Sequence, residues 1–221
     1  TNKDYKADKV ITLATGLRMP NGVAFKDGNL YVAEVSRIIV FENILSNLKE
    51  NATFKDLGVK FPEDGHHGWK YIAFSPEGKL IVPVGAPCNI CESSEKYAGI
   101  YEVDLKTKKV TTLARGVRNT VGFDWHPVTG SLWFTDNGRD MLGDDIPPEE
   151  INVLKKTGQH FGYPYCHAGT IKDPKFGDDT SCSKYSGPIH KLPAHVAPLG
   201  IQFYSGEMFP KSFQNGAFIA E

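Results

Sequence analysis

Short apolar segments alternate with polar positions along the chain, and polar or glycine-rich turns join these segments in pairs. Successive side chains of a strand point to opposite faces, so alternation over four to eight residues predicts a strand. A short polar turn between two such segments predicts an antiparallel hairpin. The clearest pairs are residues 16–25 with 27–33, 71–74 with 79–84, and 116–125 with 131–135.

These hairpins recur with a fixed period. The aromatic residues Phe25, Phe74 and Trp125 occupy equivalent places, about 50 residues apart, and a more distant fourth copy spans 198–203 and 216–220 after an insertion. Further strand pairs lie between the copies, so each unit holds about four strands. Repeated four-stranded units predict the blades of a β-propeller. A β-sandwich also has alternating strands, but the recurrence of whole hairpins favours the propeller.

Composition fits one globular domain without a strongly charged partner. The 221 residues are 40% hydrophobic and 23% charged, which is ordinary for a soluble domain. Lys and Arg total 25 against 26 for Asp and Glu, so no global field favours nucleic acid or an anionic membrane. No apolar run approaches the roughly 20 residues that a membrane span needs. A small ligand with little or no charge is therefore a better expectation than nucleic acid or a membrane.

The two ends of the sequence predict an incomplete propeller. The chain begins at Thr1 without an apolar leader, which indicates a processed or shortened protein. It ends at Glu221 directly after a strand-like segment. We therefore expect residues 1–221 to form a single partial propeller of roughly four blades that lacks its C-terminal blades. A second polypeptide that completes the propeller is one expectation.

Four cysteines favour an oxidising compartment. Cys88 and Cys91 form a close C-x-x-C pair, and Cys166 and Cys182 are more widely spaced. One C-x-x-C without further Cys or His ligands is a poor zinc site. Two disulfides are preferred over free thiols, although the sequence leaves their connectivity open. This preference predicts a periplasmic or secreted protein.

Polar residues precede the first strand of two units. His66 and His67 come just before the strand at 71–74, and Arg118 and Asn119 come just before the strand at 121–125. Histidine is the side chain most easily poised as a base, and arginine stabilises negative charge that develops on oxygen. A structural or merely exposed histidine is the alternative for each of the two.

An acidic, glycine-containing loop follows the third hairpin. Residues 136–150 contain six carboxylates. Oxygen-rich loops of this kind bind hard cations, but the spacing is not that of an EF-hand. A solvated acidic loop is the alternative interpretation.

These motifs, in this order, resemble the pyrroloquinoline-quinone-dependent glucose and sorbosone dehydrogenases. The resemblance rests on His66-His67, the Ser75–Leu80 turn, Cys88–Glu92, Gly116–Gly122, His126–Gly130, Thr135–Asp140, Gly143–Asp145, Glu149–Asn152 and Phe161–Pro164. It implies an all-β, six-bladed propeller that oxidises a sugar aldehyde or hemiacetal. The C-x-x-C and the acidic loop favour the sorbosone-dehydrogenase-like branch.

The resemblance also implies the site residues. His67 matches the general base, Arg118 the arginine that contacts the reactive carbonyl of the quinone, and Asn119 a cofactor-binding asparagine. The backbone carbonyls of Gly138 and Arg139 match those that hold the calcium ion. The implied cofactors are thus pyrroloquinoline quinone and Ca²⁺, with a sugar as substrate and an external electron acceptor.

The resemblance departs from the family pattern behind the base. In the glucose enzymes a carboxylate of the following blade orients the histidine, whereas the matching positions 85–87 read Gly-Ala-Pro. That support is therefore expected to be absent or replaced. The basic residues that hold the carboxylates of the quinone follow the position of Glu221 in the family, which implies that this polypeptide alone holds the quinone weakly.

Two other functions compete with the dehydrogenase. The segment 20–33 also resembles the calcium-dependent lactonases of the gluconolactonase type, which are six-bladed propellers too. Those enzymes bind their metal through side-chain carboxylates and an asparagine. A non-catalytic propeller that binds a carbohydrate or a protein is the third interpretation.

Overall fold

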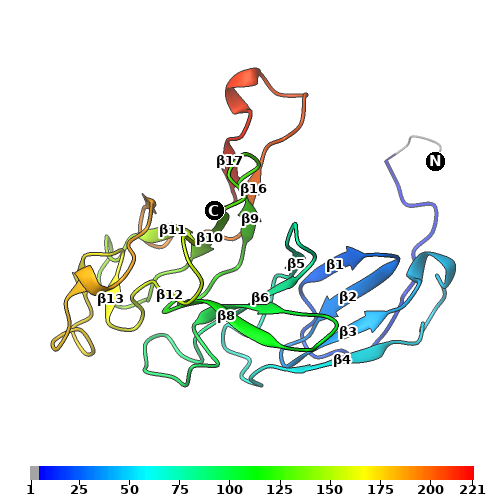
Figure 1. The fold of residues 1–221 in the computed structure, drawn as a ribbon, viewed down its shortest axis with the longest axis horizontal. Helices are drawn as coiled ribbons and strands as arrows, with labels where there is room; N and C mark the ends of the chain where they lie inside the picture. Colours follow the sequence, from blue (N-terminus) through cyan, green and yellow to red (C-terminus); the bar gives the residue numbers. More distant parts are fainter. Residues whose placement is uncertain (1–4) are drawn as a thin grey trace.

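The computed structural model describes residues 5–221, and this part of the chain is built almost entirely of strands. Three four-stranded antiparallel ladders follow one another along the chain (Figure 1). The first sheet has the order β1-β2-β3-β4, and a one-turn 3-10 helix, η1 (Ile44–Ser46), lies between its last two strands. Its strands are β1 (Val23–Lys26), β2 (Asn29–Ala33), β3 (Arg37–Phe41) and β4 (Lys55–Lys60).

The second and third sheets repeat the same consecutive order. The second contains β5 (Ala73–Phe74), β6 (Leu80–Val84), β7 (Gly99–Val103) and β8 (Val110–Arg115). A short strand from the later insertion, β12 (Gln159–His160), adds to β8 in parallel. The third contains β9 (Phe123–Trp125), β10 (Leu132–Asp136), β11 (Glu149–Val153) and β15 (His190–Leu192).

Two smaller hairpins complete the described chain. The insertion between β11 and β15 also holds the hairpin of β13 (Cys166–His167) and β14 (Ile171–Lys172), followed by the 3-10 helix η2 (Cys182–Lys184). After β15, β16 (Ile201–Phe203) pairs with β17 (Ala217–Ile219), and the 3-10 helix η3 (Lys211–Phe213) lies between them. In Figure 1 this last hairpin projects away from the other sheets.

The observed sheets confirm the all-β prediction and the repeat of whole hairpins. The aromatic anchors Phe25, Phe74 and Trp125 lie in β1, β5 and β9, the first strand of each sheet. Phe203 takes the same place in β16. The expected four units correspond to three sheets, two of four strands and one of five, and one hairpin within residues 5–221.

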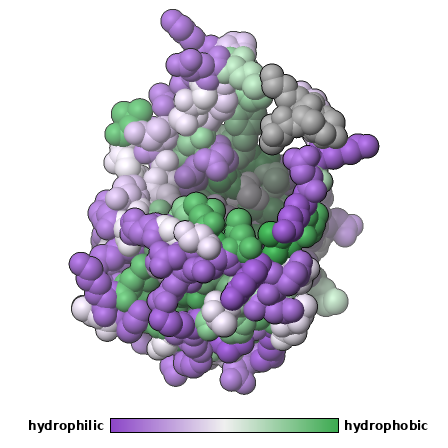
Figure 2. Space-filling view, turned by 90° about the vertical axis from the view of Figure 1, so that its right-hand side faces the viewer, coloured by the Kyte–Doolittle hydropathy of each residue, from purple (hydrophilic) through white to green (hydrophobic). Residues whose placement is uncertain are grey.

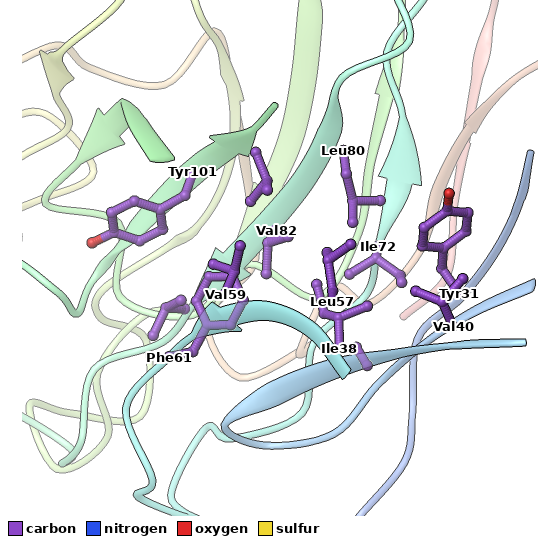
Figure 3. Packing of buried hydrophobic residues seen from close by; sticks show 13 residues of the cluster. Tyr31, Ile38, Val40, Leu57, Val59, Phe61, Ile72, Leu80, Val82 and Tyr101 are labelled. Atoms are coloured by element: carbon purple, nitrogen blue, oxygen red, sulfur yellow. The ribbon is translucent and has the colours of Figure 1, made fainter. Parts of the chain in front are cut away.

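The sheets pack face to face, and the middle sheet is buried on both sides. Along β6, Leu80, Val82 and Val84 pack into a cluster with the first sheet, where they meet Leu57 and Tyr31 (Figure 3). Ile81, on the opposite face of the same strand, packs into a second cluster with the third sheet. A strand buried on both faces has a continuous apolar sequence, which explains Leu-Ile-Val-Pro-Val at 80–84.

Two glycines allow the first strands of neighbouring units to approach closely. A Cβ on Gly22 would lie 2.0 Å from the Lys70 carbonyl oxygen, and one on Gly122 would lie 2.3 Å from that of Leu199. Both glycines precede the first strand of a unit and face the start of another unit. This contact holds the loops at one end of the sheets close together.

Hydrophobic side chains remain exposed where the sheets end. Figure 2 shows a hollow on one face of the molecule, in which hydrophobic residues gather between hydrophilic borders. Val23 and Phe25 on the edge strand β1 are 59% and 52% exposed. The helices within residues 5–221 all fall short of the length and hydrophobicity of a membrane-spanning segment.

Both expected disulfides are present. Cys88 pairs with Cys91, and Cys166 pairs with Cys182, so all four cysteines are oxidised. The first closes the C-x-x-C loop between β6 and β7. The second ties β13 to η2 within the insertion.

Candidate functional site

The predicted site residues lie on loops at one end of the sheets. In an antiparallel meander, the start of the first strand and the end of the second lie at the same edge. His67 precedes β5, Arg118 and Asn119 precede β9, and Gly138 follows β10. The fold therefore brings these loops to a common end, as the repeat predicts.

A tight turn presents His67. The backbone N–H of Gly68 donates to the Gly65 carbonyl at 3.0 Å, and the buried Lys70 ammonium donates to the Gly68 carbonyl at 3.0 Å. His67 itself has φ 47°, in the left-handed region that few non-glycine residues adopt. Its neighbour His66 is exposed, and the two ring centroids are 4.1 Å apart.

A backbone carbonyl orients the His67 ring. His67 Nδ1 lies 2.8 Å from the carbonyl oxygen of Ala86. A carbonyl only accepts hydrogen bonds, so Nδ1 carries the proton and Nε2 of the neutral ring keeps its lone pair. The support expected at residues 85–87 is thus replaced rather than absent.

Gly85 sets the distance between His67 and Asn119. A Cβ on Gly85 would lie 2.4 Å from His67 Cβ and 3.1 Å from Asn119 Oδ1. Only glycine leaves room for both side chains here. The Asn119 side-chain amide makes no hydrogen bond to any other described residue, so it is a second available polar group close to the His67 side chain.

The surroundings of His67 favour its neutral form. Burial lowers the pKa of His67 to about 4, and the positive charge of Arg118 acts in the same direction. The hydrogen bond to the Ala86 carbonyl and, to a smaller extent, the carboxylate of Asp140 act in the opposite direction. The imidazole is therefore unprotonated at neutral pH, as a general base must be.

The Arg118 guanidinium is buried and held by protein acceptors. Nε donates to the Asn89 carbonyl at 2.8 Å, and Nη2 donates to Asn89 Oδ1 at 2.9 Å. Nη1 donates to the Asn137 carbonyl at 3.0 Å, and the Asp140 carboxylate lies 3.4 Å from Nη2. Arg118 is only 5% exposed. Arg118 therefore offers a fixed positive charge rather than a mobile, fully available donor.

Buried carboxylates lie beneath Arg118 and Asn119. Asp136 accepts hydrogen bonds from the backbone N–H groups of Arg118 and Asn119, at 2.9 and 2.6 Å. Glu150 lies directly opposite Asp136 in the ladder of β10 and β11. Burial raises the pKa of both acids, that of Glu150 to about 7. Because both acids are buried and close together, one of them should keep its proton.

The carbonyl oxygens of Gly138 and Arg139 are not used by the described residues. Neither carbonyl accepts a hydrogen bond from a described residue, whereas the Gly138 N–H donates to the Glu149 carboxylate. The Arg139 side chain turns away and pairs with the buried Asp173 at 2.7 Å. Calcium binds oxygen ligands of this kind. The two carbonyls are therefore compatible with the predicted calcium site.

Within residues 5–221, no three His, Cys, Asp or Glu side chains gather into a metal-binding group. A cation here would depend on backbone oxygens, as the dehydrogenase resemblance implies. The lactonase interpretation depends on side-chain carboxylates instead, and no described cluster favours it.

The structure adds two residues that sequence reasoning missed. Asn89 contacts Arg118, and Asp140 lies near both Arg118 and His67. Asn89 lies between the two cysteines of the C-x-x-C motif, and this motif indicates a role only for the cysteines. Asp140 was one of six carboxylates in the acidic loop, and no pattern distinguished it from the others.

Sequence comparisons connect this chain to known proteins. The family model described as Glucose / Sorbosone dehydrogenase matches residues 102–221. An uncharacterized protein from Borreliella burgdorferi is 40% identical over 227 residues, covering 98% of this chain and 60% of the relative. A pyrroloquinoline quinone-dependent sugar dehydrogenase from Hypocrea jecorina is 30% identical over 126 residues, covering 42% of this chain and 29% of the relative. The match to each relative thus spans less than two thirds of its length.

Solved structures show the same fold. The iodide and calcium structures of a family AA12 carbohydrate-active enzyme from Trichoderma reesei match with TM-scores of 0.75 and 0.74. Sequence identity is 21%, and the match covers 83% of this chain and 58% of that enzyme.

Proposed function

The chain belongs to the glucose and sorbosone dehydrogenase family, and from this premise we propose that it carries the catalytic site of a quinoprotein that oxidises a sugar. One observation supports this function above the others. A neutral histidine with a free Nε2 lies beside a fixed arginine and an unpartnered asparagine amide. This combination suits removal of a proton from a hydroxyl while negative charge develops nearby.

His67 would act as the general base. Its Nε2 accepts the proton of the anomeric hydroxyl, and the Ala86 carbonyl holds the ring in the required tautomer. The hydroxyl oxygen then forms a carbonyl with the anomeric carbon as that carbon loses its hydride. When bound, calcium-associated pyrroloquinoline quinone supplies the hydride acceptor.

Arg118 and Asn119 would bind and orient the polar edge of the cofactor. Asn119 provides an amide free to donate and accept, and Arg118 provides a positive charge close to it. Because Arg118 is already hydrogen-bonded, its main contribution is electrostatic stabilisation of negative charge on oxygen. The carbonyls of Gly138 and Arg139 would hold the calcium ion.

The proposed setting is an oxidising compartment outside the cytoplasm. Two disulfides are consistent with the periplasm or the extracellular space. The proposed partners are a small sugar and an external electron acceptor.

Adding pyrroloquinoline quinone and calcium to the full-length protein tests the function. The quinone absorbance should change when members of an aldose panel are added. The His67→Ala variant should lose about 10²–10⁴ of the turnover rate, whereas the His66→Ala variant should keep it because His66 is exposed and forms no hydrogen bond among the described residues.

Three results would contradict the proposal. Full turnover by His67→Ala would remove the proposed base. Lactone hydrolysis without quinone uptake would favour the lactonase. Sugar binding without quinone uptake would favour the non-catalytic propeller.

A further inference from the structure

The Cys88–Cys91 loop lies against the guanidinium of Arg118. The central contact is Asn89, whose backbone carbonyl accepts from Arg118 Nε at 2.8 Å. Its side-chain Oδ1 accepts from Arg118 Nη2 at 2.9 Å and from the Asp140 N–H at 2.8 Å. Its Nδ2 donates to the Asp140 carbonyl at 3.0 Å. One asparagine therefore joins Arg118 to the start of the acidic loop.

The loop that carries Asn89 is itself firmly held. The disulfide closes it, and the Tyr163 hydroxyl accepts a hydrogen bond from the Cys91 N–H at 3.1 Å. Tyr163 is only 4% exposed and also lies 3.4 Å from Cys88 Sγ. The contact with Arg118 is thus made from a rigid support.

We propose that Asn89 is the positioning residue of Arg118, which makes the disulfide loop part of the quinone site. The inference rests on the proposed function. Asn89 fixes the plane of the guanidinium, and Arg118 in turn presents its charge to the cofactor and to His67.

The contacts explain why the position needs an asparagine. An arginine side chain has many rotamers, and holding one of them costs conformational entropy, which several hydrogen bonds must offset. Asn89 provides two of the acceptors of Arg118, while Asn137 and Asp140 provide the others. The Asn89 amide also uses both its oxygen and its nitrogen on Asp140, which neither alanine nor aspartate reproduces fully.

Quinone affinity provides the first test. Pyrroloquinoline quinone is titrated into the full-length protein with calcium, and binding is followed by absorbance. Asn89→Ala should weaken binding by about tenfold or more, because it removes an acceptor from a charged donor. Asn89→Asp keeps the acceptors and should recover part of this loss. Ser93→Ala, at an exposed loop position without a side-chain hydrogen bond among the described residues, should bind as the wild type does.

The pKa of His67 provides a second readout that needs no cofactor. Arg118 lowers this pKa, so Asn89→Ala should raise it as the guanidinium becomes mobile, toward the value found in Arg118→Ala. NMR titration of the histidine resonances measures this shift, and the neutral variant Asn89→Ser, which adds no charge near His67, keeps the test available if Asn89→Ala does not fold.

The two proposals fail in different ways. Wild-type quinone affinity and an unchanged His67 pKa in the neutral variants Asn89→Ala and Asn89→Ser would overturn the role of Asn89. Absence of quinone binding by the wild type would refute the proposed function, while the pKa comparison would still decide whether Asn89 positions Arg118.

Discussion

At the scale of single residues, His67 combines a fixed tautomer with a low proton affinity. The Ala86 carbonyl directs the free Nε2, while burial and Arg118 keep the ring neutral. A low pKa makes a weaker base but keeps nearly all molecules in the reactive form. The geometry therefore favours availability of the base over its strength.

We predict that kcat/KM for sugar oxidation falls only in acid. Because the pKa of His67 is lowered to about 4, the base is protonated and inactive below this value and free above it. The profile should thus be flat near neutrality and decline with a midpoint near pH 4. Quinone-dependent dye reduction from about pH 3 to about pH 8 measures it. A midpoint at the ordinary histidine pKa of 6.5 would contradict the prediction.

Glu150 and Asn152 form a buried pair that indicates a protonated acid. Asn152 Nδ2 donates to Glu150 at 2.9 Å, while Asn152 Oδ1 has no partner within the described residues. Amide oxygen and nitrogen exchange places when the group rotates by half a turn. A protonated Glu150 could then donate to Oδ1 in the rotated amide, which agrees with the raised pKa of about 7, while Nδ2 would take over the position without a partner.

Glu150→Gln should remove part of the pH dependence of stability. Between the ordinary pKa of 4.5 and the folded value of about 7, the unfolded chain loses its proton while the folded chain keeps it. Rising pH therefore lowers the free energy of unfolding through this window. Above it, Glu150→Gln should be more stable than the wild type by about 1–3 kcal/mol.

Urea unfolding at about pH 5 and about pH 8 measures this difference. Glu77→Gln, at an exposed turn, is the control. If Glu150→Gln keeps the full wild-type loss of stability between the two pH values, Glu150 is not the group responsible.

At the scale of elements, glycines decide how closely neighbouring units meet. Gly22 and Gly122 occupy the same place in the repeat, three residues before the aromatic anchors Phe25 and Trp125. Both face the backbone of the following unit. The second unit has Tyr71 at this place, and its ring packs against Phe123 with centroids 4.9 Å apart. Neighbouring units therefore meet in two ways: a glycine packs against backbone, or an aromatic ring packs against another ring.

Gly122→Ala should destabilise the protein by about 2 kcal/mol or more, because the added methyl would overlap backbone atoms that have little room to move. The nearest atoms are the Leu199 carbonyl oxygen at 2.3 Å and Gly200 Cα at 2.7 Å. Gly200→Ala is the matched control, because a Cβ there meets nothing within 4 Å. Denaturant unfolding should separate the two variants, and equal stabilities would show that the junction is loose.

The sequence predicts the elements better than it predicts the contacts of the site. Alternation and period identify the hairpins because each strand must bury at least one face. They also indicate His67, Arg118 and Asn119, which precede first strands. Neither Asn89 nor the Ala86 carbonyl can be found in this way, since both act through loop conformations that hydrophobic patterning does not encode. The extra strand β12 was missed because its two residues show no period.

At the scale of the whole molecule, the insertion between β11 and β15 is attached to the sheets at several points. β12, within the insertion, extends the second sheet, and the insertion leads directly into β15, which completes the third. The buried Asp173 of the insertion accepts from Arg139 at 2.7 Å and lies 3.0 Å from His167 Nε2. The insertion therefore links two sheets to the loop with the proposed calcium ligands.

Loss of the Cys166–Cys182 bridge should weaken the molecule as a whole. The cysteines are separated by 16 residues, and a closed loop of about 15 residues is worth roughly 3 kcal/mol. The double Ser variant should lose about this amount in urea unfolding. Unchanged stability would show that β13 and η2 stay together without the bridge.

The carbonyl behind His67 has a consequence for the fate of the abstracted proton. A carboxylate in that place would stabilise the imidazolium, whereas Ala86 offers no negative charge and Arg118 repels the cation. The proton should therefore leave quickly, either to water or by way of Asp140, whose side chain is 67% exposed. His67 would then return to its neutral form before the next sugar binds, even at acidic pH. Turnover should therefore persist in acidic medium.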